Sequence, residues 1–117
     1  MNRDLERLIS LHDLDVMISD LANKEIRRQE EKLGLSAVEA VIELRKMRED
    51  LVESISRRLR DTYSLLASHY GNAVVPVILH RCSGCLTQLP TAICAAPDRN
   101  ELVSTCPSCG RFIYWAD

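Results

Sequence analysis

The chain has 117 residues, the size of one ordinary domain, and a formal net charge of -2. Charged residues make up 27% and aromatic residues only 4%, which argues against a thick β core and favours helices packed by Leu, Ile and Val. No apolar run approaches the roughly 20 residues that a membrane helix needs, and the acidic balance excludes a global attraction to nucleic acid. Because nothing at the N-terminus resembles a secretory signal, we expect a cytoplasmic protein.

The first predicted element is an amphipathic helix over residues 3–32. Asn2 precedes it as a candidate N-cap, and apolar residues then recur at steps of three and four as far as Ala22. The second half of this segment has one strongly apolar residue, Ile26, and is typical of a solvated helix tip with paired charges. Gly34 lies where a helix-terminating glycine belongs.

A second helix is predicted directly afterwards, over residues 37–70. Ser36 and Glu39 form the S-x-x-E pattern of a capping box, so a helix end and a helix start fall close together. Such a short connection predicts that the second helix folds back antiparallel to the first, as a helical hairpin over residues 1–72. Because two helices of this length cannot bury a wide apolar face on each other alone, we expect a homo-oligomer or a partner protein at the apolar edge.

Basic residues gather on the second predicted helix, where Arg57, Arg58 and Arg60 follow an earlier cluster at residues 45–48. Acidic neighbours are interleaved with them, which favours an ordinary solvated helix face. The alternative is a local stripe that binds the phosphates of a nucleic acid.

The last part of the chain predicts a metal site. An apolar, β-branched link over residues 73–79 leaves the helix extended, and residues 80–117 then hold two C-x-x-C pairs separated by twenty residues. Two residues between the cysteines of a pair let one tight turn aim both sulfurs at one point, and two such turns complete a tetrahedron around Zn²⁺. The predicted ligands of one structural zinc ion are Cys82, Cys85, Cys106 and Cys109.

Other interpretations of these cysteines are two disulfides or a redox C-x-x-C, which fit neither the expected compartment nor two paired turns. Gly84 and Gly110 lie where such turns need glycine. Cys94 is expected to be a small buried residue, and His80 is not needed as a ligand. Because four cysteines leave zinc no open position and no nucleophile–base pair is visible, we expect no enzymatic activity.

Strands are predicted at residues 101–105 and 111–115, on either side of the second cysteine pair. The second of these carries most of the aromatic residues, which we expect to pack the ribbon against the helices. The alternative is an exposed surface for RNA or a partner protein, in which Arg111, Tyr114 and Trp115 make contacts. The predicted fold class is mainly α with a small β part, an antiparallel helical hairpin followed by a C-terminal zinc ribbon.

Taken in order, the hairpin, the apolar link and the cysteine segment resemble the C4-type zinc-ribbon family with an N-terminal coiled-coil hairpin. The better-known members of that family are linked to flagella and type III secretion. The matching stretches of this sequence are Cys82–Cys85, Leu89–Pro90, Glu101–Val103, Cys106–Arg111 and Tyr114–Trp115.

The resemblance implies zinc at the four cysteines of the two pairs and an adaptor or chaperone-like role. In that role the protein binds an alternative sigma factor of RNA polymerase or secretion components, and nucleic-acid binding has also been proposed for such proteins. Family members carry a markedly longer hairpin, whereas this one turns back near Gly34. If the family's partner binds the outer part of the hairpin, the partner of this chain need not be the same.

Overall fold

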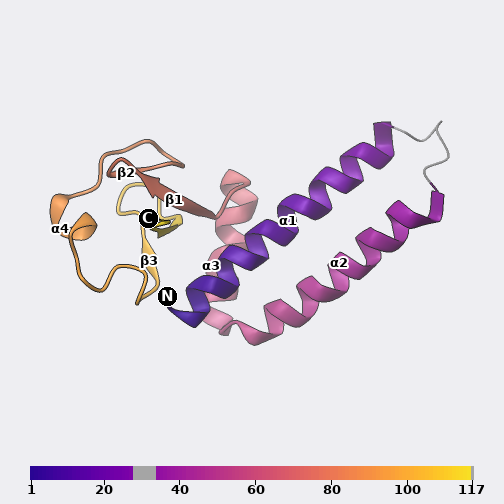
Figure 1. The fold of residues 1–117 in the computed structure, drawn as a ribbon, viewed down its shortest axis with the longest axis horizontal. Helices are drawn as coiled ribbons and strands as arrows, with labels where there is room; N and C mark the ends of the chain where they lie inside the picture. Colours follow the sequence, from indigo (N-terminus) through magenta and orange to yellow (C-terminus); the bar gives the residue numbers. More distant parts are fainter. Residues whose placement is uncertain (28–33, 117) are drawn as a thin grey trace.

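The computed structural model describes residues 1–27 and 34–116, and the side chains of residues 1–23 and 38–116 within them. It is mostly helical, with a small sheet at one end (Figure 1). The helices and strands are α1 (Arg3–Arg27), α2 (Gly34–Ser54), α3 (Arg57–Tyr70), β1 (Val74–Ile78), β2 (Arg81–Cys82), α4 (Thr91–Cys94), β3 (Ser104–Thr105) and β4 (Phe112–Tyr114). None of the helices in the described ranges is long and apolar enough to cross a membrane.

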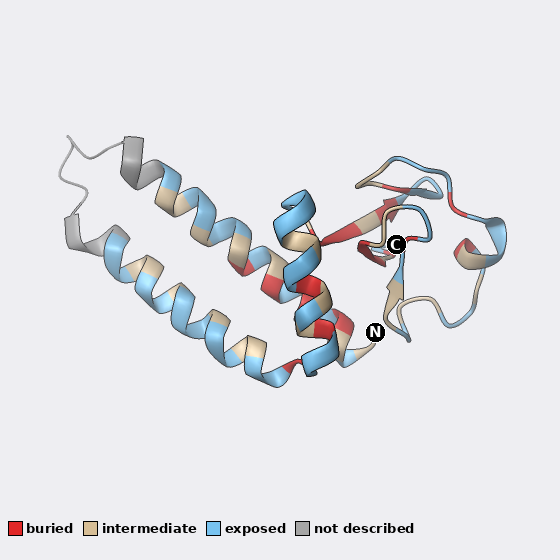
Figure 2. Ribbon diagram, turned by 180° about the vertical axis from the view of Figure 1, so that it is seen from behind, coloured by how far each residue is buried: buried red, intermediate tan, exposed pale blue. Residues whose placement is uncertain are grey.

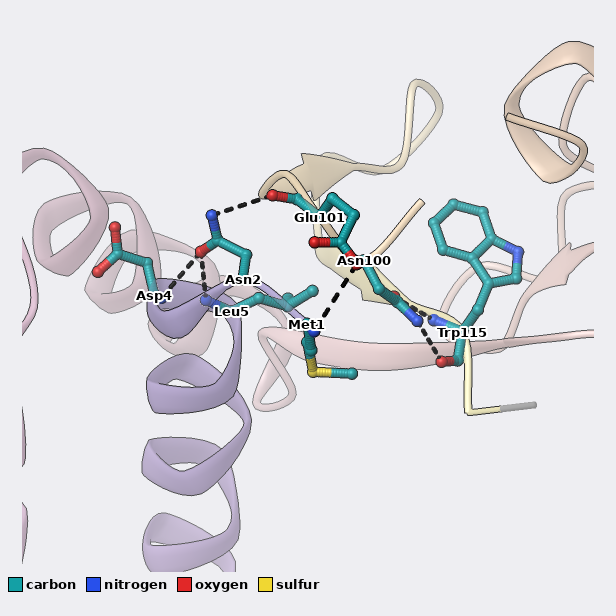
Figure 3. Close-up of polar contacts among 7 residues, drawn as sticks. All are labelled: Met1, Asn2, Asp4, Leu5, Asn100, Glu101 and Trp115. Atoms are coloured by element: carbon teal, nitrogen blue, oxygen red, sulfur yellow. Dashed lines mark hydrogen bonds and ion pairs between the residues drawn. The ribbon is translucent and has the colours of Figure 1, made fainter. Parts of the chain in front are cut away.

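Helix α1 begins at the N-cap that the sequence predicts. The Oδ1 atom of Asn2 accepts hydrogen bonds from the backbone N–H groups of Asp4 at 2.8 Å and Leu5 at 3.1 Å (Figure 3). The side-chain amide of Asn2 donates to the carbonyl oxygen of Glu101 at 3.2 Å, and its backbone N–H donates to that of Asn100 at 2.6 Å. One residue therefore both starts α1 and joins it to the segment before β3.

Helices α1 and α2 lie side by side and run in opposite directions (Figure 1). Residues 28–32 of the predicted charged tip lie outside the described residues, as does the side chain of Ser36. The backbone of Ser36 lies within α2, so the prediction that this residue is the N-cap of a capping box is wrong. Helix α2 begins at Gly34 itself, so the prediction that this glycine ends the first helix is wrong. Glycine is tolerated at the start of a helix because the first backbone N–H groups need no intrahelical partner.

The single helix predicted over residues 37–70 is also wrong, because the chain breaks there into α2 and α3. The hydroxyl of Ser54 donates back to the carbonyl oxygen of Leu51 at 2.6 Å, and the N–H of Ile55 bonds a carbonyl only three residues earlier. Ser56 then has φ of -59° and ψ of 147°, which is not helical. The break buries the side chain of Ile55 and turns α3 back towards the sheet.

One carboxylate joins the three long helices. Asp15 of α1 forms an ion pair with Arg48 of α2 and accepts a hydrogen bond from the hydroxyl of Tyr63 of α3 at 2.7 Å. Burial and this hydrogen bond raise the pKa of Tyr63 well above its usual value, since a phenolate there would be desolvated and would face a negative charge. The hydrogen bond to Asp15 likewise raises the pKa of Arg48.

The sheet has the strand order β2-β1-β4-β3 and begins earlier in the chain than predicted. Strand β1 pairs in parallel with β4, with Val74 opposite Phe112 and Val75 opposite Ile113, and it pairs antiparallel with β2. Residues 73–79 are therefore not a link between two units, because they supply a central strand. The strand predicted over residues 101–105 is confined to β3, which pairs antiparallel with β4.

The two sides of the sheet carry two hydrophobic cores, because successive strand residues face opposite sides. Val74 and Phe112 face the helices, and the residues packed with them are Leu8, Leu11, Ile55, Leu59, Tyr63 and Ala73. Val75 and Ile113 face the cysteines, and the residues packed with them are Val77, Cys82, Leu89, Cys94, Cys106 and Trp115. Figure 2 shows buried residues gathered where α1, α3 and β1 meet. Strands β1 and β4 therefore belong to both cores.

Candidate metal centre

Four cysteine side chains converge beside the sheet. The sulfur atoms of Cys82, Cys85, Cys106 and Cys109 all lie within 4.8 Å of one another. The Sγ atoms of Cys82 and Cys109 are 3.8 Å apart, and those of Cys85 and Cys106 are 3.7 Å apart. Thiolates bound to zinc at about 2.3 Å form a tetrahedron whose edges are about 3.8 Å long. These cysteines are therefore positioned to bind one metal ion, and the arrangement is compatible with a single structural zinc.

The sulfur positions contradict the disulfide interpretation. The S–S bond of a disulfide is about 2.0 Å long, whereas all five cysteines of this chain are free thiols. Cys94 is 4% exposed within the core on this side of the sheet, as predicted, and it is not part of the sulfur cluster. His80 is exposed and also lies outside that cluster.

The two cysteine pairs lie on turns with the same backbone geometry. The N–H of Leu86 donates to the carbonyl oxygen of Cys82 at 2.8 Å, and the N–H of Gly110 donates to that of Cys106 at 2.8 Å. Both donors are left-handed, with φ of 64° at Leu86 and 83° at Gly110. The need for glycine at position 110 is confirmed, whereas no glycine marks the equivalent left-handed position at Leu86. Aligning the residue after each pair would have found the equivalence.

Gly84 is required for a close approach rather than for a left-handed turn. A Cβ atom there would lie 2.6 Å from the Cδ atom of Arg111. Arg111 donates from Nε to the carbonyl oxygen of Asn72 at 3.0 Å and places its Cζ atom 3.8 Å from the ring centroid of Tyr70. The hydroxyl of Tyr70 donates to the carbonyl oxygen of Cys109 at 2.9 Å. Arg111 thus packs against the first cysteine turn at Gly84 and against Tyr70 of α3, which in turn bonds the second cysteine turn at Cys109.

The thiols of one turn have opposite electrostatic surroundings. Burial raises the pKa of Cys82 to about 12, because the thiolate would lose its hydration. Hydrogen bonds from the side chain and backbone of Thr87 lower the pKa of Cys85 to about 6. A bound cation would supply the positive charge that keeps a buried thiolate ionised.

Two of the residues near the C-terminus that are predicted to contact nucleic acid or a partner are buried. Arg111 is 7% exposed and Trp115 is 5% exposed, so the exposed surface predicted for them is wrong. The side chain of Trp115 packs in the core that holds the cysteines, and its backbone N–H and carbonyl both bond the side chain of Asn100, at 2.8 and 2.6 Å (Figure 3). The side chain of Arg111 is held inside by its hydrogen bond to the carbonyl oxygen of Asn72. Tyr114 is half-buried against the helical core.

The remaining predicted contacts lie on α3, away from the sulfur cluster. Arg57 and Arg58 are exposed, and Arg60 is half-buried. The Nε atom of Arg60 has no hydrogen-bond partner within the described part of the chain. Of the residues predicted to contact nucleic acid or a partner, Arg57 and Arg58 are therefore the ones that are exposed.

Comparisons with known proteins give a likeness of fold. No protein-family model and no curated protein matches the sequence. The solved structure of CT398 from Chlamydia trachomatis is 27% identical with a TM-score of 0.59, covering 79% of this chain and 38% of that one. HP0958 from Helicobacter pylori is 24% identical with a TM-score of 0.58, covering 84% of this chain and 46% of that one. This chain therefore spans less than half the length of either protein.

Proposed function

We propose that this chain is a non-enzymatic, zinc-stabilised adaptor or regulatory protein that binds other proteins through its helices. The observation that carries the proposal is the convergence of four sulfur atoms within 4.8 Å on one side of a sheet whose other side holds the helices. A closed site of four thiolates favours a structural role for the ion, because no coordination position is left for a substrate. Reduced thiols of this kind suit the cytoplasm, where we place the protein.

Zinc supports this role by stabilising a part of the chain that is too small to fold by apolar burial alone. Thiolates are the soft ligands that zinc accepts readily in tetrahedral geometry. Binding at such sites contributes roughly 10–16 kcal/mol, which appears as folding free energy. The metal therefore gives the helices a rigid base without taking part in chemistry.

The helices support protein binding because they keep apolar side chains in contact with solvent. Large apolar residues that are at least 40% exposed on α1, α2 and α3 are Val16, Met17, Val38, Ile42, Met47 and Leu65. Figure 2 shows that much of the described part of α2 is exposed. Such apolar surface is typical of interaction sites. The partner class that the family resemblance suggests is an alternative sigma factor or a secretion or flagellar component, and self-association through the same helices is a further candidate.

A nucleic-acid-binding regulator is the second candidate function. It is favoured by the exposed side chains of Arg57 and Arg58, whereas the Nε atom of Arg60 is buried and not accessible to a nucleic acid. The burial of Arg111 and Trp115 removes the part of this surface that lay on the sheet.

Affinity capture from an extract of the native cells, repeated after nuclease treatment, tests the two candidates. For a protein adaptor, we expect a specific protein to remain bound after the nuclease treatment. Capture that disappears with nuclease, or a steep loss of binding to a nucleic acid as salt rises, would instead favour the second candidate.

A further inference from the structure

Two hollows lie along the contact between α1 and α2, and they differ in chemistry. One is lined by Asp15, Ile18, Arg45, Arg48 and Glu49. The other has a volume of about 610 Å³ and is lined by Ser10, Asp13, Leu14, Met17, Met47, Asp50 and Leu51. By the helical period the two sets point to different sides of the helix pair. We call the second hollow the Met17/Met47 groove.

A carboxylate of the first hollow is paired with an arginine of the same chain, whereas the carboxylates of the second hollow are not. Asp15 and Arg48 form an ion pair across the first hollow and so neutralise each other. In the Met17/Met47 groove, Asp13 and Asp50 are both exposed, and neither forms an ion pair with any described residue. The groove therefore presents one carboxylate from each helix and no basic lining residue.

The floor of the Met17/Met47 groove is apolar and adaptable. Met17 is 45% exposed and Met47 is 54% exposed, one on each helix. Methionine is unbranched and polarisable, and it is common on surfaces that accommodate a range of apolar side chains. Leu14 and Leu51 lie beneath, more deeply buried. Each apolar pair, one per helix, spans about one helical turn of 5.4 Å, which suits one or two apolar side chains from an added helix.

We propose that the Met17/Met47 groove binds an amphipathic helix of a partner protein whose apolar face is flanked by Lys or Arg. A third helix laid over two packed helices buries its apolar stripe between them. Basic residues at its edges would meet Asp13 and Asp50 and would set the orientation and the rate of association. The inference rests on the proposed function, because it names the surface and the chemistry of the partner.

A second copy of this chain is a poorer occupant of the same groove. A two-fold contact places the same patch against itself. Asp13 and Asp50 of both copies would then meet across an apolar centre, and like charges in such a place repel. A basic helix from another protein replaces that repulsion with attraction.

The test measures fluorescence anisotropy of a labelled synthetic peptide built from leucine and lysine at helical spacing. Comparison peptides carry the same residues in scrambled order, or glutamate in place of lysine. We expect Met17→Ala with Met47→Ala to weaken binding roughly tenfold. We expect Asp13→Asn with Asp50→Asn to weaken it similarly at low salt and to reduce its salt dependence.

Matched controls remove equivalent groups outside the groove. Val16→Ala shortens an apolar side chain that is 44% exposed on α1, and Asp61→Asn removes an exposed carboxylate on α3. Both should leave the affinity unchanged. Every substituted side chain is exposed, and the buried or half-buried Leu14 and Leu51 are left unchanged. Circular dichroism should therefore show the same fold for every variant.

Equal affinity of groove and control variants for the peptide would overturn the assignment, as would a preference for the glutamate peptide. If sedimentation shows a wild-type dimer that the groove substitutions convert to a monomer, the groove binds a second copy of this chain and the assignment to a partner helix is overturned. The proposed function fails separately, if capture from the cell extract depends on nucleic acid while the groove still binds the peptide. A protein captured equally by the wild type and the groove variants would leave the adaptor role intact and reject the groove.

Discussion

Four residues other than glycine hold a left-handed backbone in the described chain, and all lie outside the helices. Leu79 and His80 form the two-residue turn between β1 and β2, Leu86 follows the first cysteine pair, and Asn100 precedes β3. A two-residue hairpin turn with both φ values positive matches the twist of its strands but is best made by Asn-Gly. Residues with a side chain adopt this conformation at a cost of roughly 1–2 kcal/mol each. The first cysteine pair is therefore flanked by left-handed positions that are not occupied by glycine, whereas the second pair is followed by Gly110.

The equivalence of Leu86 with Gly110 leads to a stability prediction. We expect Leu86→Gly to be about 1 kcal/mol more stable than Leu86→Ala, because only glycine relieves the left-handed strain. Both substitutions remove a side chain that is 66% exposed, so lost packing is matched. Urea unfolding of the metal-loaded proteins measures the difference. If the alanine variant is as stable as the glycine variant, the strain at this turn is negligible.

Asn100 joins the two ends of the described chain, and its loss should be costly. Its side chain makes two hydrogen bonds to the backbone of Trp115, and its own carbonyl oxygen accepts the N–H of Asn2. We expect Asn100→Ala to lower the free energy of unfolding by roughly 1–3 kcal/mol, because the backbone groups of Trp115 lose their partners. Asn100→Gly keeps the left-handed freedom and loses the hydrogen bonds, so it isolates their share. Trp115 is the one tryptophan of the chain, so its fluorescence measures the unfolding of both variants.

At the level of helices and strands, local patterns predicted more than non-local ones did. The N-cap at Asn2 and the two long helical stretches follow from residues that are neighbours in sequence. The break after Ser54 carries no Gly or Pro, and Ile55 continues the apolar pattern, so a single helix was the natural prediction. The break becomes favourable only through burial of Ile55 against α1 and the sheet, which sequence periodicity does not contain.

The hydrogen bond from Tyr63 to Asp15, which joins α3 to α1, predicts a specific pH dependence. The raised pKa of Tyr63 means that the folded chain holds this proton more tightly than the unfolded chain does. Its contribution to stability is therefore complete below the ordinary tyrosine pKa of 10.0 and declines as the pH rises above it. We expect Tyr63→Phe to be roughly 1 kcal/mol less stable at neutral pH, and to lose less stability than the wild type in alkali.

Urea unfolding of the wild type and Tyr63→Phe at a series of pH values measures both effects. The slope of unfolding free energy against pH above 10.0 is the decisive quantity, because other groups that titrate there are common to both proteins. Identical slopes for the two proteins would show that Tyr63 is not held in its neutral form.

For the whole molecule, the two cores should not be independent, because β1 and β4 belong to both. Phe112 and Ile113 are adjacent in β4 and face opposite cores. We expect removal of the metal by a chelator to shift the emission of Trp115 and to lower the thermal stability of the helices in the same step. Fluorescence and far-ultraviolet circular dichroism, followed together, measure this coupling.

Cys106→Ser should reproduce the effect of the chelator, whereas Cys94→Ala should retain one metal ion per chain. Cys94 is buried in the same core but lies outside the sulfur cluster, so it controls for the loss of a buried thiol. Metal analysis of the purified proteins checks the stoichiometry. Helices that melt at an unchanged temperature after metal loss would show that the shared sheet does not couple the two parts.

The candidate metal site was more predictable than its surroundings for a physical reason. Two residues between cysteines constrain a local turn, so the spacing alone identifies Cys82, Cys85, Cys106 and Cys109 as a set. The parallel pairing of Val74 with Phe112 and the burial of Arg111 depend on chain segments far apart in sequence. Residue patterns hold little information about such contacts, so the sequence predicts a link where the structure has a central strand, and it offers Arg111 as a possible surface contact where the structure buries it.

Strand pairing and thiols on both sides of the segment after α4 connect the two halves of the cysteine region. We therefore expect that the chain can be cut in this segment without the two halves separating. Strand β1 and the first cysteine pair precede α4, whereas β3, β4 and the second pair follow it, and Ala95, Pro97 and Asp98 between them are exposed. A protease that cuts there would produce two fragments, each with half of the β1–β4 ladder and two of the four thiols. The fragments should co-purify until a chelator separates them, so this fold could be reassembled by complementation from two polypeptides.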